Sequence, residues 1–389
     1  MTVAAFDAIV LGAGAAGLMA AATAGQRGRR VLLLDHAEKA GKKILISGGG
    51  RCNFTNLGAA PDRFLSANPH FARSALGRYA AADFLALVER HGIAWHEKTL
   101  GQLFCDGSAR QIVEMLLGEC EMGGVRLRLD HAVTAIDRPD GAYRVETSQG
   151  AFTAPRLVIA TGGPSIPKMG ATGFAYDVAR RFGLKVVEPR PALVPLTLGE
   201  ADMGFRALSG VAVQAVARCG RAAFPEAALF THRGLSGPAI LQISSYWRRG
   251  DTIAIDMAPG RDAAADLVAA KRARPRAQAR TVLGEMLPAR LAETIAPPGE
   301  LANMTDKTLV ALGQRLNGWP FVPNGSEGFA KAEVTVGGVD TAGLNQKTLE
   351  AKAVPGLHFI GEAVDVTGWL GGYNFQWAWA SGWSAGQVL

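Results

Sequence analysis

The sequence lacks any apolar run of the roughly 20 residues that a membrane-spanning helix needs. It holds only four cysteines among 389 residues, with neither Cys-x-x-Cys pairing nor a metal-ligand spacing. These absences argue against a membrane protein, a disulfide-built scaffold and a metal site, so we expect reduced thiols and no metal. A strand pattern begins within a few residues of Met1, leaves no space for a signal peptide and favours a cytoplasmic protein.

Charged residues are also few, at 19% of the chain, whereas hydrophobic residues make up 48%. A chain of 389 residues with this composition can bury a large core and exceeds one ordinary domain, so we expect two or three. The net charge of +7 and an isoelectric point near 9.4 favour polyanionic partners, nucleic acid among them. A composition rich in arginine and alanine explains the same excess without such a partner.

The organising motif lies near the N-terminus, where an apolar run ends in Gly12, Gly14 and Gly17 at Gly-x-Gly-x-x-Gly spacing. An alanine-rich helical segment follows. In a dinucleotide-binding turn the first glycine permits the tight turn, the second lets backbone approach a pyrophosphate, and the third lets helix pack on strand. A second apolar run, residues 31–34, ends in Asp35, where an acid would bind the adenosine ribose. This order of elements predicts a dinucleotide site.

Two further segments favour close approach of backbone to a ligand. Residues 39–56 combine basic side chains with three consecutive glycines, Gly48–Gly50, followed by Arg51 as a donor. Because three glycines in a row lose much chain entropy on ordering, we expect a loop that meets a flat or phosphorylated ligand. The apolar run 156–160 ends on the small residues 161–163, which allows a similar approach at the carboxyl edge of a parallel sheet.

The middle of the chain changes character twice. Residues 70–125 look mainly helical from their apolar spacing. Short alternating runs at 125–129, 142–146 and 156–159 predict strands, with a hairpin turn at Asp140-Gly141 between two of them. The proline-dense segment 189–195 predicts a crossing into another domain. Residues 193–258 are β-rich in pattern.

Two parts of this second region carry candidate substrate contacts. Residues 229–241 indicate a strand that turns into a helix with Ser236 as N-cap, and His232 within it either faces substrate or, more commonly for histidine, packs or caps. Residues 261–320 predict an all-helical insert, and residues 271–280 within it carry five positive charges and no acid. A solvated helix face and a phosphate-contact surface both explain that run. The RNA-contact candidates are Lys271, Arg272, Arg274 and Arg276.

The last segment, residues 355–382, predicts a return to the nucleotide domain. A strand ends at Gly361, an acid follows, and Gly371-Gly372 leads into an aromatic-rich helix. We expect the N-terminus of this helix to point at the ligand. If the ligand is a flavin, the helix dipole favours negative charge on the N1–C2=O edge of the reduced ring.

With these motifs in view, the chain resembles the BaiN/YhiN-type flavoproteins, also known as aminoacetone-oxidase-type FAD-binding enzymes. The matching segments, in the family's order, are residues 41–56, 160–163, 191–196, 230–238 and 371–379. The resemblance implies an α/β fold, in which a Rossmann-type FAD-binding domain carries an inserted β-rich, barrel-like domain with its own small helical insert. The implied bounds are 1–190 and 355–389 for the FAD-binding domain, 191–260 and 321–354 for the β-rich domain, and 261–320 for the helical insert.

The resemblance also implies roles for individual residues. Gly12, Gly14 and Gly17 would hold the pyrophosphate, and Asp35 would hold the ribose where the family usually has glutamate. The other implied cofactor-binding residues are Ala15, Lys43, Ser47, Gly48, Gly50, Arg51, Val133, Thr161, Gly162, Gly361, Glu362, Asp365, Gly372, Tyr373 and Asn374. Departures from the family pattern at residues 164–167 and 363–370 leave substrate identity open.

FAD makes an oxidoreductase the expected function. One dinucleotide fingerprint and no Cys-x-x-x-x-Cys argue against a two-nucleotide disulfide reductase, so NADPH or NADH would visit the flavin only transiently. Members of the resembled family are associated with three reactions: reduction of uridine to dihydrouridine in ribosomal RNA, reduction of a steroid-like enone, and oxidation of a small aminoketone. The basic charge favours the RNA substrate, with the other two and a flavin-bearing RNA-binding protein without turnover as alternatives. Cys52 and Tyr373 are candidate proton donors, although packing is the commoner role of a thiol. The sequence does not indicate an oligomeric state.

Overall fold

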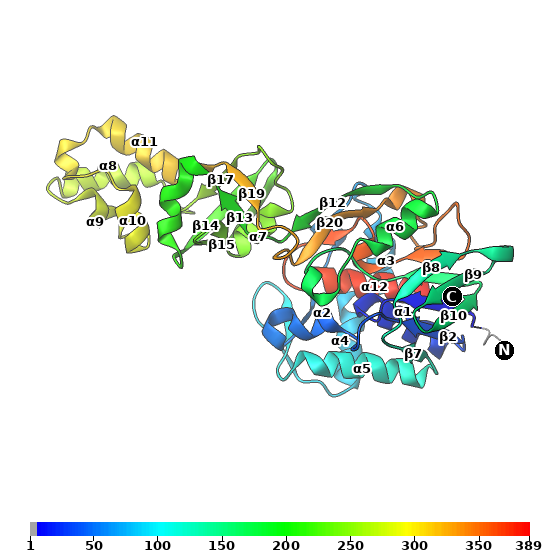
Figure 1. Cartoon of the computed structure of the whole chain (residues 1–389). Helices are drawn as coiled ribbons and strands as arrows, with labels where there is room; N and C mark the ends of the chain where they lie inside the picture. The colour runs from blue at the N-terminus through cyan, green and yellow to red at the C-terminus, as the bar shows by residue number, and fades with distance from the viewer. Residues whose placement is uncertain (1–5) are drawn as a thin grey trace. The chain divides into compact units, whose positions relative to one another are not determined.

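The computed structural model describes residues 6–389 as two compact units (Figure 1). The first unit joins the N-terminal part, up to Arg190, to Val334–Leu389, and the second unit is Pro191–Glu333. The chain leaves and re-enters the first unit through the paired strands β12 (Val186–Ala192) and β20 (Val334–Val339). The expected three-domain division, with its own bounds, stays a prediction.

The first unit alternates strands and helices. Its other strands are β1 (Ala8–Leu11), β2 (Val31–Leu34), β3 (Asn53–Asn56), β4 (Phe64–Leu65), β5 (Trp95–Glu97), β6 (Gln102–Cys105), β7 (Arg126–Arg128), β8 (Val133–Asp137), β9 (Tyr143–Thr147), β10 (Gly150–Ala154), β11 (Arg156–Ile159), β21 (Leu357–Phe359) and β22 (Thr367–Gly368). Its helices are α1 (Ala15–Gln26), α2 (Lys42–Ile46), α3 (Ala72–Arg78), α4 (Ala81–Arg90), α5 (Ala109–Met122), α6 (Phe174–Arg181) and α12 (Tyr373–Gly386).

A five-stranded parallel sheet in the order β21-β11-β1-β2-β7 forms the centre of this unit. The predicted β-α-β unit at residues 1–35 is confirmed as β1, α1 and β2, with residues 1–5 of that range outside the described residues. From β1 the chain proceeds outward to β2 and β7 on one side, whereas β11 and β21 lie on the other. The order therefore reverses between β1 and β11, and ligands of such sheets bind in the crevice at this switch point.

Helices α1 and α12 pack closely against each other, so the two ends of the chain share one core (Figure 1). Small residues permit the approach, since a Cβ on Gly382 would lie 2.5 Å from the Ala16 carbonyl oxygen. On its other side α12 buries Trp379, whose ring stacks on Phe84 at 4.3 Å between centroids and whose indole donates to the Phe54 carbonyl oxygen. The predicted return of residues 355–382 to the nucleotide domain is thus confirmed.

The second unit contains a seven-stranded antiparallel sheet in the order β18-β17-β14-β15-β16-β13-β19. Its strands are β13 (Leu196–Leu198), β14 (Ala212–Cys219), β15 (Ala222–Phe230), β16 (Gly234–Ser236), β17 (Ile253–Asp256), β18 (Trp319–Phe321) and β19 (Pro323–Ser326). Its helices are α7 (Pro238–Ser244), α8 (Ala263–Ala273), α9 (Ala279–Leu283), α10 (Ala289–Ile295) and α11 (Asp306–Leu316). The β-rich pattern of residues 193–258 and the helical pattern of residues 261–320 are both confirmed.

The mainly helical character of residues 70–125 is confirmed by α3, α4 and α5. The strands β5 and β6 interrupt these helices, because β6 pairs with both β5 and β3. Two local expectations were wrong. The turn at Asp140-Gly141 does close a hairpin, but between β9 and β8 rather than β7, which joins the parallel sheet. Gly237 rather than Ser236 is the N-cap of α7, because the backbone there has φ +85° and a Cβ would lie 2.8 Å from the Ala227 carbonyl oxygen.

Candidate FAD site

The glycine turn sits at the switch point of the parallel sheet. Gly12 follows β1 with φ +103°, and a Cβ there would lie 2.6 Å from the Ala160 carbonyl oxygen at the end of β11. A Cβ on Gly17 would lie 1.8 Å from the Gly12 carbonyl oxygen. Gly14, the N-cap of α1, has nothing within 4 Å of its Cβ position. Packing therefore requires Gly12 and Gly17, whereas Gly14 leaves open space before the positive end of α1, which begins at Ala15.

Asp35 follows β2, as the sequence predicts, but its carboxylate holds the glycine turn. One oxygen accepts from the Ala13 backbone N–H at 2.6 Å, and the other accepts from the Ala37 N–H at 2.8 Å. A carboxylate has lone pairs for further partners, so ribose binding by Asp35 stays a prediction. Val133, predicted to meet the adenine through its backbone, begins β8 opposite Thr147.

The loop at Ser47–Gly50 forms a single irregular turn in which all three glycines have positive φ. A Cβ on Gly48 would lie 2.8 Å from the Asn53 nitrogen, whereas Gly49 and Gly50 have nothing within 4 Å. Arg51 is exposed beside them. The loop thus presents bare backbone to open space, as a ligand-approaching loop should.

Cys52, next to this loop, has no accessible surface. Burial raises the pKa of its thiol to about 12, although a hydrogen bond with Ser47 opposes the shift. The thiol is therefore protonated at neutral pH, but contact with a substrate requires local rearrangement. Its role as a proton donor stays a prediction. All four cysteines are buried and free.

Lys43 and Glu362 converge from α2 and from the segment after β21. The Lys43 Nζ lies 2.7 Å from a Glu362 carboxylate oxygen and donates to the Ser165 hydroxyl at 2.6 Å. Ser165 donates to the other Glu362 oxygen at 2.6 Å, and Thr335 donates to that oxygen at 3.1 Å. Sequence reasoning identified Lys43 and Glu362 but missed Ser165 and Thr335, although Ser165 directly follows a glycine-rich strand end.

Orphaned polar atoms gather near this cluster. The Thr161 hydroxyl at the end of β11 is buried and has no hydrogen-bond partner within residues 6–389. Gly162 beside it has φ +72°, and a Cβ there would lie 3.7 Å from a Glu362 carboxylate oxygen. Burial, reinforced by the charges of Glu362 and Asp365, raises the pKa of Tyr176. Hydroxyl groups and an unmatched polar atom thus lie near the Lys43–Glu362 ion pair, which suits a polar ligand.

The last glycine pair brings α12 against β3. Gly372, the N-cap of α12, has φ +94°, and a Cβ there would lie 2.4 Å from the Thr55 carbonyl oxygen. Tyr373 is nearly buried, with its ring edge-on to Phe64 at 6.1 Å. The side-chain amide of Asn374 forms two hydrogen bonds with the Gly368 backbone: its oxygen accepts from the N–H and its nitrogen donates to the carbonyl oxygen.

Two other predicted residues near this end are held inside the protein. Gly361 has φ +64°, donates its backbone N–H to the Ser381 hydroxyl and lies against α1, where a Cβ would meet Ala16 at 2.9 Å. Asp365 is 3% exposed, accepts from the Ala67 N–H at 2.8 Å, and has its pKa raised by burial. Cofactor contacts by both residues stay predictions.

The remaining candidates lie in the second unit. His232 is exposed on the loop after β15. In the basic segment, Lys271 binds Asp306 at 2.7 Å, and Arg274 forms a two-pronged pair with Glu285 at 2.7 and 2.9 Å. Arg272 and Arg276 are exposed and form no ion pair within the described residues. Half of the predicted RNA-contact charge is thus neutralised by the protein itself.

The switch-point residues fit a dinucleotide. Open Cβ space at Gly14, Gly49 and Gly50, the free amides of the 12-residue helix α1 and the orphaned Thr161 hydroxyl offer donors and room to an anionic ligand. Across residues 6–389 no cluster of three His, Cys, Asp or Glu side chains could hold a metal ion. No helix in the same residues is long and apolar enough to cross a membrane.

The chain is similar to proteins of known class. The model for the "HI0933-like protein Rossmann domain" matches residues 6–388. Ribosomal RNA dihydrouridine synthase of Escherichia coli is 51% identical over 99% of this chain and 98% of its own length. The Haemophilus influenzae protein of the same name is 46% identical, covering 96% of each chain. The 3-dehydro-bile acid delta(4,6)-reductase of Clostridium scindens is 29% identical over 97% of this chain and 98% of its own.

Solved structures agree on the fold. A 3-ketosteroid-delta4-(5alpha)-dehydrogenase from Rhodococcus jostii superposes with a TM-score of 0.52 and 15% identity, covering 98% of this chain and 97% of that one. The resemblance read from the sequence and the expected Rossmann-type fold are both confirmed. The chain belongs to the HI0933-like family, and it is an oxidoreductase built on a Rossmann-type FAD-binding domain.

Proposed function

We propose that this flavoprotein reduces the C5=C6 double bond of uridine in ribosomal RNA, with NADPH or NADH as the electron donor. The observation that carries the proposal is that two relatives, 51% and 46% identical along almost their whole length, share the name ribosomal RNA dihydrouridine synthase. The donor is inferred from chemistry, because saturating a double bond consumes two electrons that a transient nicotinamide cofactor can supply.

The chain's own residues have distinct tasks in this reaction. The amides before α1 and the bare loop Ser47–Gly50 would bind the cofactor, and the positive end of α12 would face its reduced ring. Bound FAD supplies the hydride for one carbon of the double bond. Lys43, held by Glu362 at 2.7 Å, would fix the loop side of the site.

The neighbouring carbon of the uracil must receive a proton, so the site needs a positioned acid. Tyr373 suits this role better than Cys52, because it opens α12 and retains 6% of its surface whereas Cys52 retains none. The hydroxyl of Tyr373 lies 3.3 Å from the Cβ position of Gly58, on the chain that leaves β3. We propose Tyr373 as the proton donor and keep Cys52 as the alternative.

Reduction of a small enone is the second candidate, favoured by the 29% identical relative named as a bile acid reductase. Both reactions add a hydride and a proton to an activated double bond, so the site chemistry above serves either. The RNA substrate ranks first because of the much higher identity of the two synthases.

The test begins with purified holoprotein and NADPH or NADH without oxygen, with flavin absorbance as the readout. We expect bleaching, followed by dihydrouridine in ribosomal RNA transcribed in vitro, measured by mass spectrometry of its nucleosides. Tyr373→Phe should keep flavin bleaching and lose product, while Cys52→Ala should keep both. Bleached flavin that reduces a steroid enone but leaves the RNA unchanged would overturn the RNA substrate. Flavin bleaching by an aminoketone, followed by peroxide release when oxygen is admitted, would instead indicate an oxidase.

A further inference from the structure

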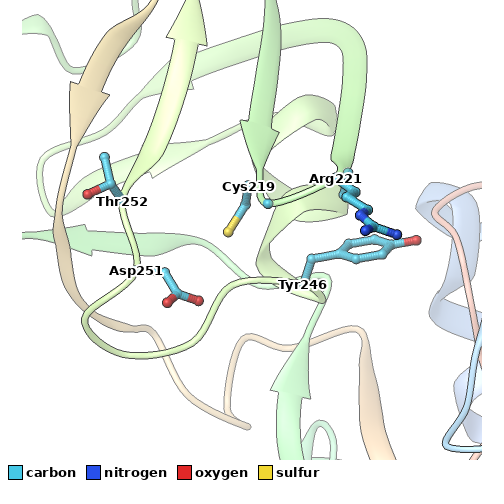
Figure 2. Close-up of a pocket in the computed structure, with 7 residues that line it drawn as sticks. Cys219, Arg221, Tyr246, Asp251 and Thr252 are labelled. Carbon is cyan, nitrogen blue, oxygen red and sulfur yellow. The ribbon is translucent and has the colours of Figure 1, made fainter.

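The second unit contains a pocket of about 480 Å³ that the FAD site does not use. It lies where the turn between β14 and β15 meets the segment between α7 and β17, and its lining includes Cys219, Arg221, Tyr246, Asp251 and Thr252 (Figure 2). Ligand pockets commonly have volumes of about 300–1,000 Å³, so this hollow is large enough for a small ligand or one unit of a polymer.

Three arginines lie in or beside the pocket, and we call them its positive rim. Arg221 lines the pocket, whereas Arg248 and Arg249 are not part of the lining but lie on the adjoining turn that leads from Tyr246 to Asp251. All three are exposed, and none forms an ion pair within residues 6–389. In the basic segment, Asp306 and Glu285 match the charges of Lys271 and Arg274, whereas Arg272 and Arg276 are also unpaired within the described residues.

The nearby acidic residues do not neutralise the positive charge of this rim. Asp251 is exposed in the pocket, and one of its oxygens accepts from the Arg248 backbone N–H at 2.9 Å. Asp256, the next acid on β17, lies 4.0 Å from Arg218 and accepts from Asn317. Arg221, Arg248 and Arg249 therefore leave a surplus of positive charge around one carboxylate, which can itself accept a hydrogen bond from an amino group.

Tyr246 supplies a flat surface inside the positive rim. Its ring is partly exposed, packs against Phe224 at 5.6 Å between centroids, and lines the pocket together with Arg221 (Figure 2). An aromatic ring binds unpaired bases by stacking, and arginines bind the flanking phosphates. Such a combination fits single-stranded RNA better than a duplex, whose bases are stacked within the helix.

We propose that this pocket of the second unit is an RNA-docking site that takes one unpaired nucleotide of the substrate, with its base on Tyr246 and its phosphates on Arg221, Arg248 and Arg249. This inference rests on the proposed function, since it names the surface that holds the ribosomal RNA. The site would bind and orient RNA and take no part in the chemistry. It replaces the segment 271–280 as the main contact surface.

The test compares two triple variants of the holoprotein that lose the same charge. One is Arg221→Ala with Arg248→Ala and Arg249→Ala, and the other is Arg272→Ala with Arg276→Ala and Arg280→Ala. The probes are fluorescein-labelled oligouridylate and in vitro transcribed ribosomal RNA, with fluorescence anisotropy as the readout. We expect the pocket variant to lose at least about tenfold in affinity, and its slope of log K against log salt to fall by about 2, since each phosphate contact on a single strand contributes about 0.7.

Tyr246→Leu should weaken oligouridylate binding by about 5- to 150-fold, the range for one lost stacked base. If Tyr246→Leu fails to fold, the triple arginine variant still tests the docking site, because its three substitutions are at exposed side chains. Equal affinity of the pocket variant and wild type, or a larger loss in the 272/276/280 variant, would overturn the docking site. Dihydrouridine formed by wild type reports the proposed function separately, so a pocket variant that binds normally while wild type makes product refutes only the docking site.

Discussion

Gly14 and Gly17 of the glycine turn allow cofactor binding to be separated from folding. In Gly14→Ala the new methyl group meets nothing within 4 Å, and the backbone at φ −88° and ψ −167° accepts alanine. The lower entropy of the unfolded chain and the poorer N-cap oppose each other, so we expect the stability of the FAD-free protein to change by less than about 1 kcal/mol. In Gly17→Ala the methyl group would lie 1.8 Å from the Gly12 carbonyl oxygen, which forces α1 off β1.

Gly17→Ala should therefore lower the stability of the protein, and Gly14→Ala should lower its affinity for FAD. Overpacking in Gly17→Ala should cost about 1–3 kcal/mol or more of unfolding free energy. The methyl group of Gly14→Ala occupies the open space before α1 and should cost two amide-to-phosphate hydrogen bonds, each worth about 1.5–3 kcal/mol. The sum corresponds to FAD affinity weaker by about 10²–10⁴-fold.

Urea unfolding of FAD-free protein measures the unfolding free energy. Quenching of flavin fluorescence as FAD is titrated with protein measures the FAD affinity independently. Ala15→Gly is a matched control, since it changes the neighbouring residue without adding a methyl group. If Gly14→Ala binds FAD within about threefold of wild type, the space before α1 is not the pyrophosphate site and the reasoning fails.

Four further predictions concern other parts of the first unit. Trp379→Ala should lower the unfolding free energy by about 3–5 kcal/mol in urea titrations, because its ring is fully buried against Phe84; a loss below about 1 kcal/mol would contradict the packing. A double-mutant cycle of Lys43→Met and Glu362→Gln, read by urea unfolding, should give a coupling above about 0.5 kcal/mol, since their charges meet at 2.7 Å; simple additivity would refute the cluster. Burial alone would raise the pKa of Glu119, but hydrogen bonds from Gln26 and His91 lower it below 4.5. Its stabilisation is therefore full above that value and lost as pH falls through the lower folded pKa, so urea midpoints should decline less steeply below pH 4.5 in Glu119→Gln than in wild type. Cys52, buried and with a thiol pKa of about 12, should resist iodoacetamide in the native protein and react after unfolding, as mass mapping of alkylated cysteines would show.

Local pattern was sufficient for the elements that we expect to bind the cofactor. The apolar run before Gly12 and the glycine pair before α12 each encode a strand or helix within a few residues, and both lie where the sequence predicts. Short-range pattern fails where pairing with another segment decides the secondary structure. Trp95–Glu97 is a strand only because it pairs with β6, and three residues carry too little periodicity to reveal it.

The sequence also did not predict contacts between residues that lie far apart in the chain. Ser165 reaches Lys43 from 122 residues away, and Glu362 reaches it from 319 residues away. The positive charge at 271–280 appeared free because its acids lie outside the run, with Asp306 bound to Lys271. No sequence pattern marks such partners, since the fold alone brings them together.

The packing of α12 on α1 and β3 has a consequence for synthesis. The indole of Trp379 binds a carbonyl oxygen 325 residues earlier, at Phe54. At ribosomal rates of about 5–20 residues per second, the early segment waits about 16–65 s for its partner. During that interval the apolar surface that α12 will cover is exposed on a nascent chain, a natural target for chaperones.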